Sequence, residues 1–267
     1  MTARVLHVSD LHIGRRDTQE PVAALQQLVS EHRPDLVLAT GDLAHRGRGV
    51  ELERACEILE SLGASYLAVP GNHDIPYTFP ARFARPFDEW ERVFGPAEPV
   101  FESDELVVAG MNSVRPWRQQ GGAVEKEALQ RAAARIADAS PSALRVVALH
   151  HHLAAPPWRA ARKRPLKRRG SVLAALADAG AELVVGGHVH QASITELGEF
   201  RATVERRAGS LVLVTAPGLG RPRPHRSGEA QGLNVYESDD KRLTVITFIW
   251  DGESFSEVGR RSFPRRI

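Results

Sequence analysis

The chain has one cysteine among its 267 residues, no long hydrophobic run and almost no net charge. The single Cys56 excludes an internal disulfide framework, and without a cysteine cluster we do not expect a structural zinc site. No stretch approaches the roughly 20 apolar residues of a membrane helix, and no signal-peptide-like run precedes the first predicted strand. A formal charge of +2 gives no whole-molecule field that selects a partner. A cytoplasmic globular protein is therefore the default expectation.

Short apolar runs alternate with helix-period segments over the first 195 residues. We predict strands at residues 4–8, 36–39, 65–69, 106–111, 145–149 and 181–185. We predict helices at residues 21–32, 50–62, 80–94, 126–139 and 171–179. Alternation of this kind is typical of a largely parallel sheet that helices cover on both faces.

The helical pattern stops after residue 195. Residues 211–215, 233–237, 243–250 and 256–262 are predicted strands, with Asp239-Asp240 and Asp251-Gly252 as hairpin turns. No internal repeat or long linker interrupts the chain. We therefore predict one domain over residues 1–267, an α/β sandwich with flanking helices. Residues 1–195 of this domain carry the motifs. Residues 196–267 form a C-terminal meander that completes the second sheet.

Side chains of metal-binding type directly follow five of the predicted strands. The five motifs are Asp10-Leu11-His12, Gly41-Asp42, Gly71-Asn72-His73-Asp74, His150-His151-His152 and Gly187-His188-Val189-His190. In an open α/β sheet the carboxyl ends of the strands meet at one edge, where ligands bind. Glycine before Asp42, Asn72 and His188 allows the chain to turn sharply there. If strand geometry persists through Asp-X-His and His-X-His, alternate side chains point the same way and reach one centre.

The donor types in these motifs favour divalent transition metals. Carboxylate, imidazole and amide oxygen together suit manganese, iron, zinc or cobalt. The donors are too many for one ion and about right for two. A bridging carboxylate would hold two ions about 3.5–4 Å apart, the separation used for in-line displacement at phosphorus.

The five motifs, in this order, resemble the motif set of the calcineurin-like metallophosphoesterase superfamily. The resemblance implies that family's β-sandwich with flanking helices and an active site at the strand ends. It also implies two divalent metal ions, Mn²⁺ first, with Fe, Zn or Co as alternatives. Position by position, Asp10, His12 and His190 would bind the first metal; Asn72, His150 and His188 would bind the second; Asp42 would bridge the two.

The resemblance gives His73 a different role, as the proton donor or charge stabiliser that faces the leaving oxygen. Two positions depart from the family pattern. Three histidines stand where His-His-Pro is common, so His151 is the alternative to His150 as a ligand. His45 stands where many members carry an aspartate that supports the catalytic histidine, which leaves the support of His73 undefined and argues against a protein phosphatase.

Candidate substrate-binding residues lie in three other segments. Residues 158–169 carry seven basic side chains and no acid, with Arg162 and Lys163 near the middle. This segment is either a clamp for an anionic substrate or membrane surface, or a solvated loop. Arg115 follows another strand and could line the pocket. His225, in a loop rich in glycine, proline and arginine, could approach the substrate.

Taken together, the sequence predicts a dinuclear phosphoesterase in which a metal-bound hydroxide attacks a small phosphodiester or pyrophosphate. Its length and motifs resemble bacterial enzymes of cyclic-nucleotide or nucleotide-lipid type. A DNA exonuclease of the repair type is one alternative, which the modest net charge and the lack of a coiled-coil segment disfavour. A non-catalytic scaffold on the same fold is the other, and it has no chemical need for the predicted ligands and His73.

Overall fold

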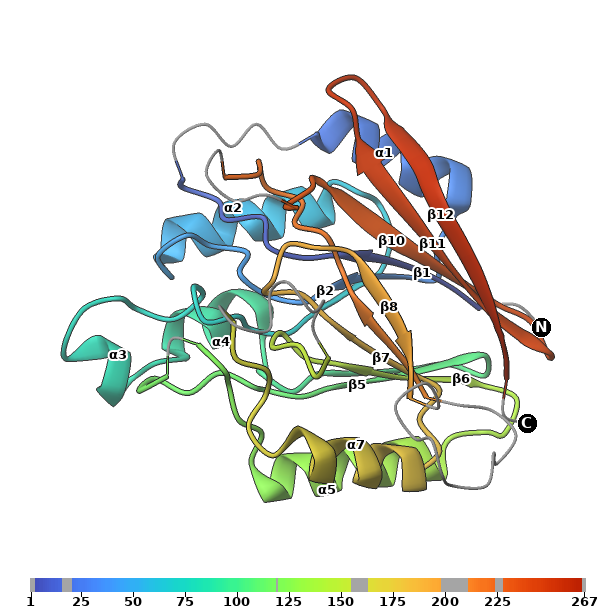
Figure 1. Cartoon of the computed structure of the whole chain (residues 1–267). Helices are drawn as coiled ribbons and strands as arrows, with labels where there is room; N and C mark the ends of the chain where they lie inside the picture. The colour runs from blue at the N-terminus through green and yellow to red at the C-terminus, as the bar shows by residue number, and fades with distance from the viewer. Residues whose placement is uncertain are drawn as a thin grey trace.

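The computed structural model describes residues 3–15, 21–118, 120–154, 163–197, 211–223 and 228–265. Over these ranges the chain forms two six-stranded sheets packed face to face, with helices against the outer face of each (Figure 1). The predicted α/β sandwich with flanking helices is confirmed.

The first sheet has the strand order β12-β11-β10-β1-β2-β3. Three parallel strands from the beginning of the chain form one half of it: β1 (Ala3–Val8), β2 (Leu36–Ala39) and β3 (Tyr66–Ala68). An antiparallel meander from the end of the chain forms the other half: β10 (Gly232–Ser238), β11 (Arg242–Trp250) and β12 (Phe255–Pro264). The two halves join where β1 pairs with β10.

The second sheet has the order β4-β5-β6-β7-β9-β8. Its parallel centre consists of β5 (Leu106–Gly110), β6 (Leu144–Ala148), β7 (Leu183–Gly186) and β9 (Val212–Thr215). Antiparallel strands β4 (Val100–Glu102) and β8 (Ser193–Glu196) form its edges.

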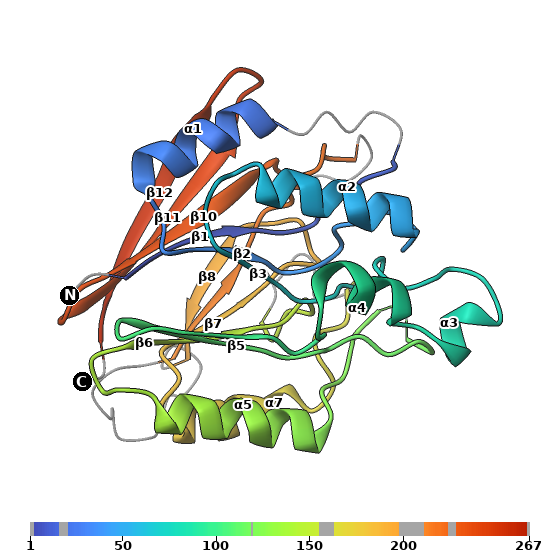
Figure 2. The ribbon, with the colours of Figure 1, turned by 180° about the vertical axis from the view of Figure 1, so that it is seen from behind.

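Helices cover the outer faces of the two sheets. Helices α1 (Val22–His32), α2 (Gly49–Glu60) and α4 (Asp88–Phe94) contribute to the core on the side of the first sheet. Helices α5 (Lys126–Asp138) and α7 (Arg169–Asp178) cover the second sheet. The short α3 (Ala81–Ala84) stands at the margin of the molecule, away from both sheets, in both views (Figures 1 and 2).

The core consists of three apolar layers because both faces of each sheet are covered. In β1, Leu6 and Val8 pack toward the helices, whereas Val5 packs between the sheets. The second sheet repeats this alternation, with Val147 facing α5 and α7 and Val146 facing the first sheet. Strands buried on both faces have continuous apolar sequences, which explains why their positions could be predicted.

The structure corrects three expectations about the fold. The parallel strands are divided between two sheets instead of forming one. The C-terminal meander extends the first sheet, and only β9 of the C-terminal strands joins the second. The helix predicted at residues 80–94 is two helices, α3 and α4, because Pro86 lacks the N–H that a continuous helix needs. None of the described helices has the length and apolar character required to cross a membrane.

Candidate metal centre

The predicted metal-binding side chains come together where the carboxyl ends of strands from both sheets meet. Asp10 and His12 follow β1, Asp42 follows β2 and Asn72 follows β3. His150 follows β6, and His188 and His190 follow β7. All seven side chains are buried, each at most 6% exposed. Residues that lie up to 180 positions apart in the sequence therefore meet at these strand ends.

The first cluster consists of Asp10, His12 and His190. The Nε2 atoms of His12 and His190 lie 3.2 Å apart, and His190 Nε2 lies 3.1 Å from Asp10 Oδ1. The other carboxylate oxygen of Asp10 accepts hydrogen bonds from Ser9 Oγ at 2.7 Å and from the His188 N–H at 2.9 Å. These bonds fix the carboxylate so that Oδ1 points toward the two rings.

The second cluster consists of Asp42, His150 and His188. His150 Nε2 lies 3.3 Å from Asp42 Oδ2 and 3.1 Å from His188 Nδ1. The same Asp42 oxygen lies 3.9 Å from His12 Nε2, so Asp42 faces both clusters. The two clusters are therefore adjacent, and Asp42 is the carboxylate between them.

The donor spacing in both clusters fits a shared cation. Two ring nitrogens at about 2.1 Å from one ion, with an angle of about 90–110° between them, lie about 3.0–3.4 Å apart. The observed separations of 3.1 and 3.2 Å between ring nitrogens, and of 3.3 Å between His150 Nε2 and Asp42 Oδ2, fall in this range. In addition, Asn72 Oδ1 is buried and has no hydrogen-bond partner among the described residues, although buried amide oxygens are normally satisfied. The residues present thus fit two divalent ions.

The backbone at these residues is unusual. Five donor residues have positive φ: Asp10, His12, Asp42, His188 and His190, with values from 53° to 71°. A non-glycine residue in this left-handed region costs roughly 1–2 kcal/mol, although Asp and His tolerate it better than most. Strand geometry therefore does not persist through Asp-X-His and His-X-His, and the reason given for their convergence was wrong. The side chains converge because the chain turns at each of these residues.

The glycines before the donors have two different functions. Gly41 has φ +81°, so it provides the sharp turn that was expected. Gly71 and Gly187 instead allow close approach, because a Cβ on Gly71 would lie 2.1 Å from the Asp42 nitrogen. A Cβ on Gly187 would lie 1.8 Å from Ser9 Oγ and 2.4 Å from Asp10 Oδ2.

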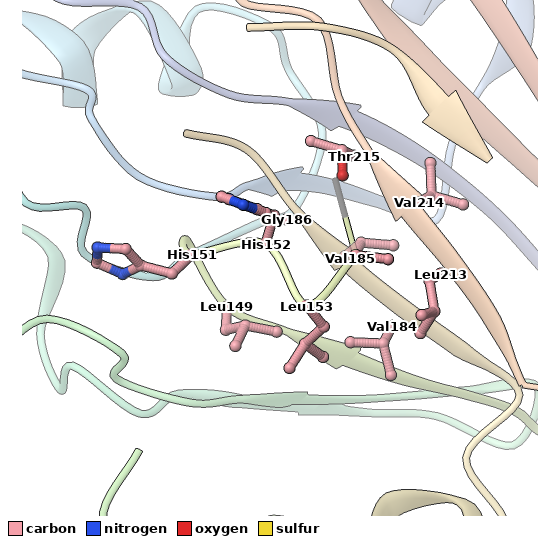
Figure 3. Close-up of a pocket in the computed structure, with 11 residues that line it drawn as sticks. Leu149, His151, His152, Leu153, Val184, Val185, Gly186, Leu213, Val214 and Thr215 are labelled. Carbon is pink, nitrogen blue, oxygen red and sulfur yellow. The ribbon is translucent and has the colours of Figure 1, made fainter. Parts of the chain in front are cut away.

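His150 and His151 point to different places. His150 Nδ1 lies 2.7 Å from the carbonyl oxygen of Thr40, so it donates its proton there and Nε2 faces the second cluster. His151 Nδ1 pairs with Ser113 Oγ at 2.9 Å, and Figure 3 shows its ring turned away from the apolar residues around Leu153. The cavity drawn there measures about 10 Å³, enough for about one water molecule and too small for a substrate.

Burial and mutual contact set the charges in the centre. Burial lowers the pKa of His12, His151 and His188 well below the ordinary value, so these rings are neutral, as a metal ligand must be. Burial also opposes a charge on His150, but the Asp42 carboxylate outweighs it and raises the pKa to about 9. Burial raises the pKa of Asp42, but the neighbouring His150, His73 and His12 together outweigh that effect and hold this pKa below the usual range.

His73 lies beside the first cluster and is supported without the usual aspartate. Its ring centre is 4.8 Å from that of His12, and the backbone N–H of His73 donates to Asp42 Oδ1 at 2.8 Å. Its Nδ1 lies 2.8 Å from the backbone oxygen of His45 and 2.7 Å from the Tyr77 hydroxyl. The carbonyl of residue 45 therefore takes the place of the missing carboxylate.

Two supporting residues were not found from the sequence. Asp74 is buried and accepts the N–H groups of Gly71 and Ala44, each at 2.7 Å, which ties the turn after β3 to the turn after β2. The position of Asp74 in the Gly-Asn-His-Asp motif was the sequence feature that could have indicated its role. Tyr77 had no signal beyond being four residues after His73.

Of the two predicted substrate-binding residues that the structure describes, Lys163 and Arg115, it is Lys163 that lies at this centre. It is 8% exposed, and its Nζ lies 3.1 Å from the His188 oxygen and 3.5 Å from His188 Nε2. Arg115 is buried and pairs with Glu125 at 3.3 Å, and its contact with substrate stays a prediction. Arg162 and His225, with the first part of the basic segment 158–169, lie outside the described residues.

A third group of potential ligands, His12, His45 and His73, has ring nitrogens within 4.8 Å of one another. It shares His12 with the first cluster. An ion bound there would therefore compete with the first cluster for that ring.

Two named phosphodiesterases are similar to this chain over part of its length. It is 30% identical over 134 residues to a probable cyclic nucleotide phosphodiesterase of Synechococcus, covering 45% of this chain and 48% of that protein. It is 25% identical over 199 residues to the 3',5'-cyclic adenosine monophosphate phosphodiesterase CpdA of Escherichia coli K12, covering 70% of each. The chain therefore spans about half the length of the first relative.

The fold also occurs in solved structures of low sequence identity. The purple acid phosphatase PPD1 of yellow lupin superimposes with a TM-score of 0.71 at 14% identity, over 99% of this chain and 53% of that one. The sequence profile of the calcineurin-like phosphoesterases matches residues 3–192, which include all five motifs. The chain belongs to the calcineurin-like phosphoesterase family.

Proposed function

We propose that this chain is a dinuclear-metal phosphoesterase that hydrolyses a small phosphodiester or pyrophosphate. The observation that carries the proposal is the pair of adjacent buried clusters, each with donors spaced for one cation and both facing Asp42. In this proposal Asp10, His12 and His190 hold one ion, Asn72, His150 and His188 hold the other, and Asp42 bridges them. Mn²⁺ is the first ion to test.

Bound divalent ions would supply a nucleophile at neutral pH and neutralise charge at phosphorus. The chain's own residues do the rest. Ser9, Thr40 and the His188 N–H orient the donor side chains through the hydrogen bonds described above. The half-buried His73, beside the first cluster, is positioned to donate a proton to the departing oxygen.

A small phosphodiester is the substrate class that the relatives support. The Synechococcus and E. coli proteins are named for cyclic nucleotide hydrolysis, and the match to the second covers 70% of this chain. The test is a turnover screen of the manganese-loaded protein against bis-p-nitrophenyl phosphate, cyclic nucleotides, nucleotide-sugar pyrophosphates and duplex DNA. Hydrolysis of DNA alone, with steep salt dependence, would favour the exonuclease instead.

Two variants connect turnover to the centre. We expect Asp42→Ala to lose bound manganese and to lower kcat/KM about 10³-fold or more, because both clusters lose their shared carboxylate. We expect His73→Ala to retain both ions but to turn over about 10²–10⁴-fold more slowly. Manganese content by elemental analysis separates the two effects.

Asp104→Ala, at an exposed carboxylate in the turn between β4 and β5, is the matched control and should behave as the wild type. Equal activity in the wild type and Asp42→Ala would refute the proposed function.

A further inference from the structure

Large aromatic side chains are exposed in one place on the described part of the chain. Tyr77, Phe79, Phe83 and Trp117 are 42, 83, 54 and 70% exposed, and they come from two short segments, residues 76–83 and 115–118. The other large hydrophobic side chains exposed in the described residues are three valines. Exposed apolar side chains gathered in one region mark a binding site more often than chance exposure does. We name these four residues the aromatic rim.

Arg82 fastens the two segments of the rim to each other. It is 6% exposed, its Nε donates to the Pro116 oxygen at 2.8 Å, and its Nη1 donates to the Pro76 oxygen at 3.0 Å. Its guanidinium also lies over the Tyr77 ring, 5.8 Å from the ring centre. The residue before Trp117 is thus tied to the residue before Tyr77. A buried arginine thus holds the backbone of the two segments together.

The rim begins at the proposed proton donor. The Tyr77 hydroxyl lies 2.7 Å from His73 Nδ1, and the two ring centres are 5.5 Å apart. From Tyr77 the rim continues to Phe79, which precedes α3, and to Phe83, which lies in α3. This helix stands at the margin of the molecule (Figures 1 and 2). A group bound beside His73 therefore has the Tyr77 ring as a neighbour.

We propose that the aromatic rim binds the leaving alcohol of the substrate, and that this alcohol carries a planar aromatic ring. The inference rests on the proposed function, since it uses His73 to fix which end of the phosphodiester lies nearest the rim. Aromatic faces stack on planar rings of many kinds with little sequence or shape selectivity, as they do on nucleobases. Because the rim is continuous with His73, we expect it to bind part of the substrate and not a lipid surface or a second copy of this chain.

The test compares two diesters that differ only in the size of the leaving ring, methyl phenyl phosphate and methyl 2-naphthyl phosphate. For the manganese-loaded wild type we expect KM to be lower for the naphthyl ester. Trp117→Ser and Phe83→Ser should each raise KM for the naphthyl ester about tenfold and for the phenyl ester less, with kcat little changed. Trp117→Phe should keep most of the wild-type difference in KM between the two esters. Val258→Ser, at an exposed site on β12, should change neither KM.

A binding measurement separates this inference from the proposed function. 2-Naphthyl phosphate is titrated into chelated, metal-free protein, and the fluorescence change of the wild type is compared with that of Trp117→Phe. A saturable fluorescence change that is present in the wild type and absent in Trp117→Phe supports ring binding at the aromatic rim. If such protein hydrolyses no phosphoester, the proposed function fails and the inference about the rim stands. Normal turnover with equal KM values in wild type and rim variants, and no change at Trp117, overturns the inference. Loss of vesicle binding or of a dimer in those variants, without a change in KM, also overturns it.

Discussion

The two donor clusters have the same number of ligands but different surroundings. In the first cluster, the two ring nitrogens and Asp10 Oδ1 face one another, and hydrogen bonds to Oδ2 from Ser9 and the His188 N–H orient the Asp10 carboxylate. In the second cluster, His150 Nε2 lies 3.3 Å from Asp42 Oδ2, and the Lys163 ammonium lies 3.5 Å from His188 Nε2. A cation entering the second cluster therefore meets positive charge that the first does not present. We therefore expect the two positions, although joined by Asp42, to bind metal ions with unequal affinity.

The strongest test of the comparison uses the two close-packed glycines, one beside each cluster. Gly71→Ala would push a methyl group into the Asp42 backbone, and Gly187→Ala would push one into Ser9 and Asp10. We expect each variant to lose about 100-fold in manganese affinity, Gly187→Ala at the first cluster and Gly71→Ala at the second, because ligand orientation is disturbed. Calorimetric titration with Mn²⁺ resolves the two binding steps.

Gly259→Ala is the matched control, since a Cβ there meets nothing within 4 Å. If Gly71→Ala and Gly187→Ala bound two ions as the wild type does, the claim that these glycines set the ligand geometry would be wrong.

A second test concerns His7, which lies on β1 beneath the first cluster. His7 is buried between the Tyr236 hydroxyl at 2.6 Å and Thr40 Oγ1 at 2.8 Å, while the Thr40 carbonyl receives His150 of the second cluster. Burial lowers the pKa of His7 from 6.5 to about 3. The unfolded chain therefore takes up the proton first, and the stability due to neutral His7 is present above pH 6.5 and lost as the pH falls toward 3.

We expect chelated wild-type protein to lose about 2 kcal/mol more stability than His7→Gln between pH 6.5 and pH 5. Urea unfolding of both proteins at several pH values measures this difference, and the metal ligands titrate equally in both. Parallel stability curves over this range would show that His7 does not titrate as described.

The smallest effect is expected from Lys163→Met. Removing the ammonium should tighten the second manganese step about tenfold and leave the first unchanged, because like charges repel strongly in a buried site. Lys167→Met, at an exposed lysine of the same segment, is the control. Equal effects of Lys163→Met on both steps, or none on either, would remove the proposed difference between the clusters.

The sequence predicted the strands and the gathering of their ends for a clear physical reason. Strands that are buried on both faces have continuous apolar runs, and the donors follow those runs directly. It did not predict β4 or β8, which have three and four residues and a partly exposed pattern. It also could not divide the strands between two sheets, because pairing is decided by long-range contacts that periodicity does not record.

The site was predicted in composition but not in its local geometry. Motif order identified the residues, whereas the left-handed backbone at His12 or His190 has no signature in a single sequence. Contacts made by backbone atoms were equally hidden, such as the His45 carbonyl that supports His73. The pairing of Arg115 with Glu125 was hidden as well, because the two residues are ten positions apart in the sequence and no pattern connects them.

Each cluster takes donors from both sheets: Asp10 and His12 with His190 in one, Asp42 with His150 and His188 in the other. Ions held there would act as two cross-links between halves of the sandwich that are otherwise joined by apolar packing and by hydrogen bonds such as that from the His188 N–H to Asp10. In a chain with a single cysteine, such links would do what disulfides do in secreted proteins, and a chelator could open them. Hydrogen exchange at the ends of β1 and β7 would then quicken together when the ions leave.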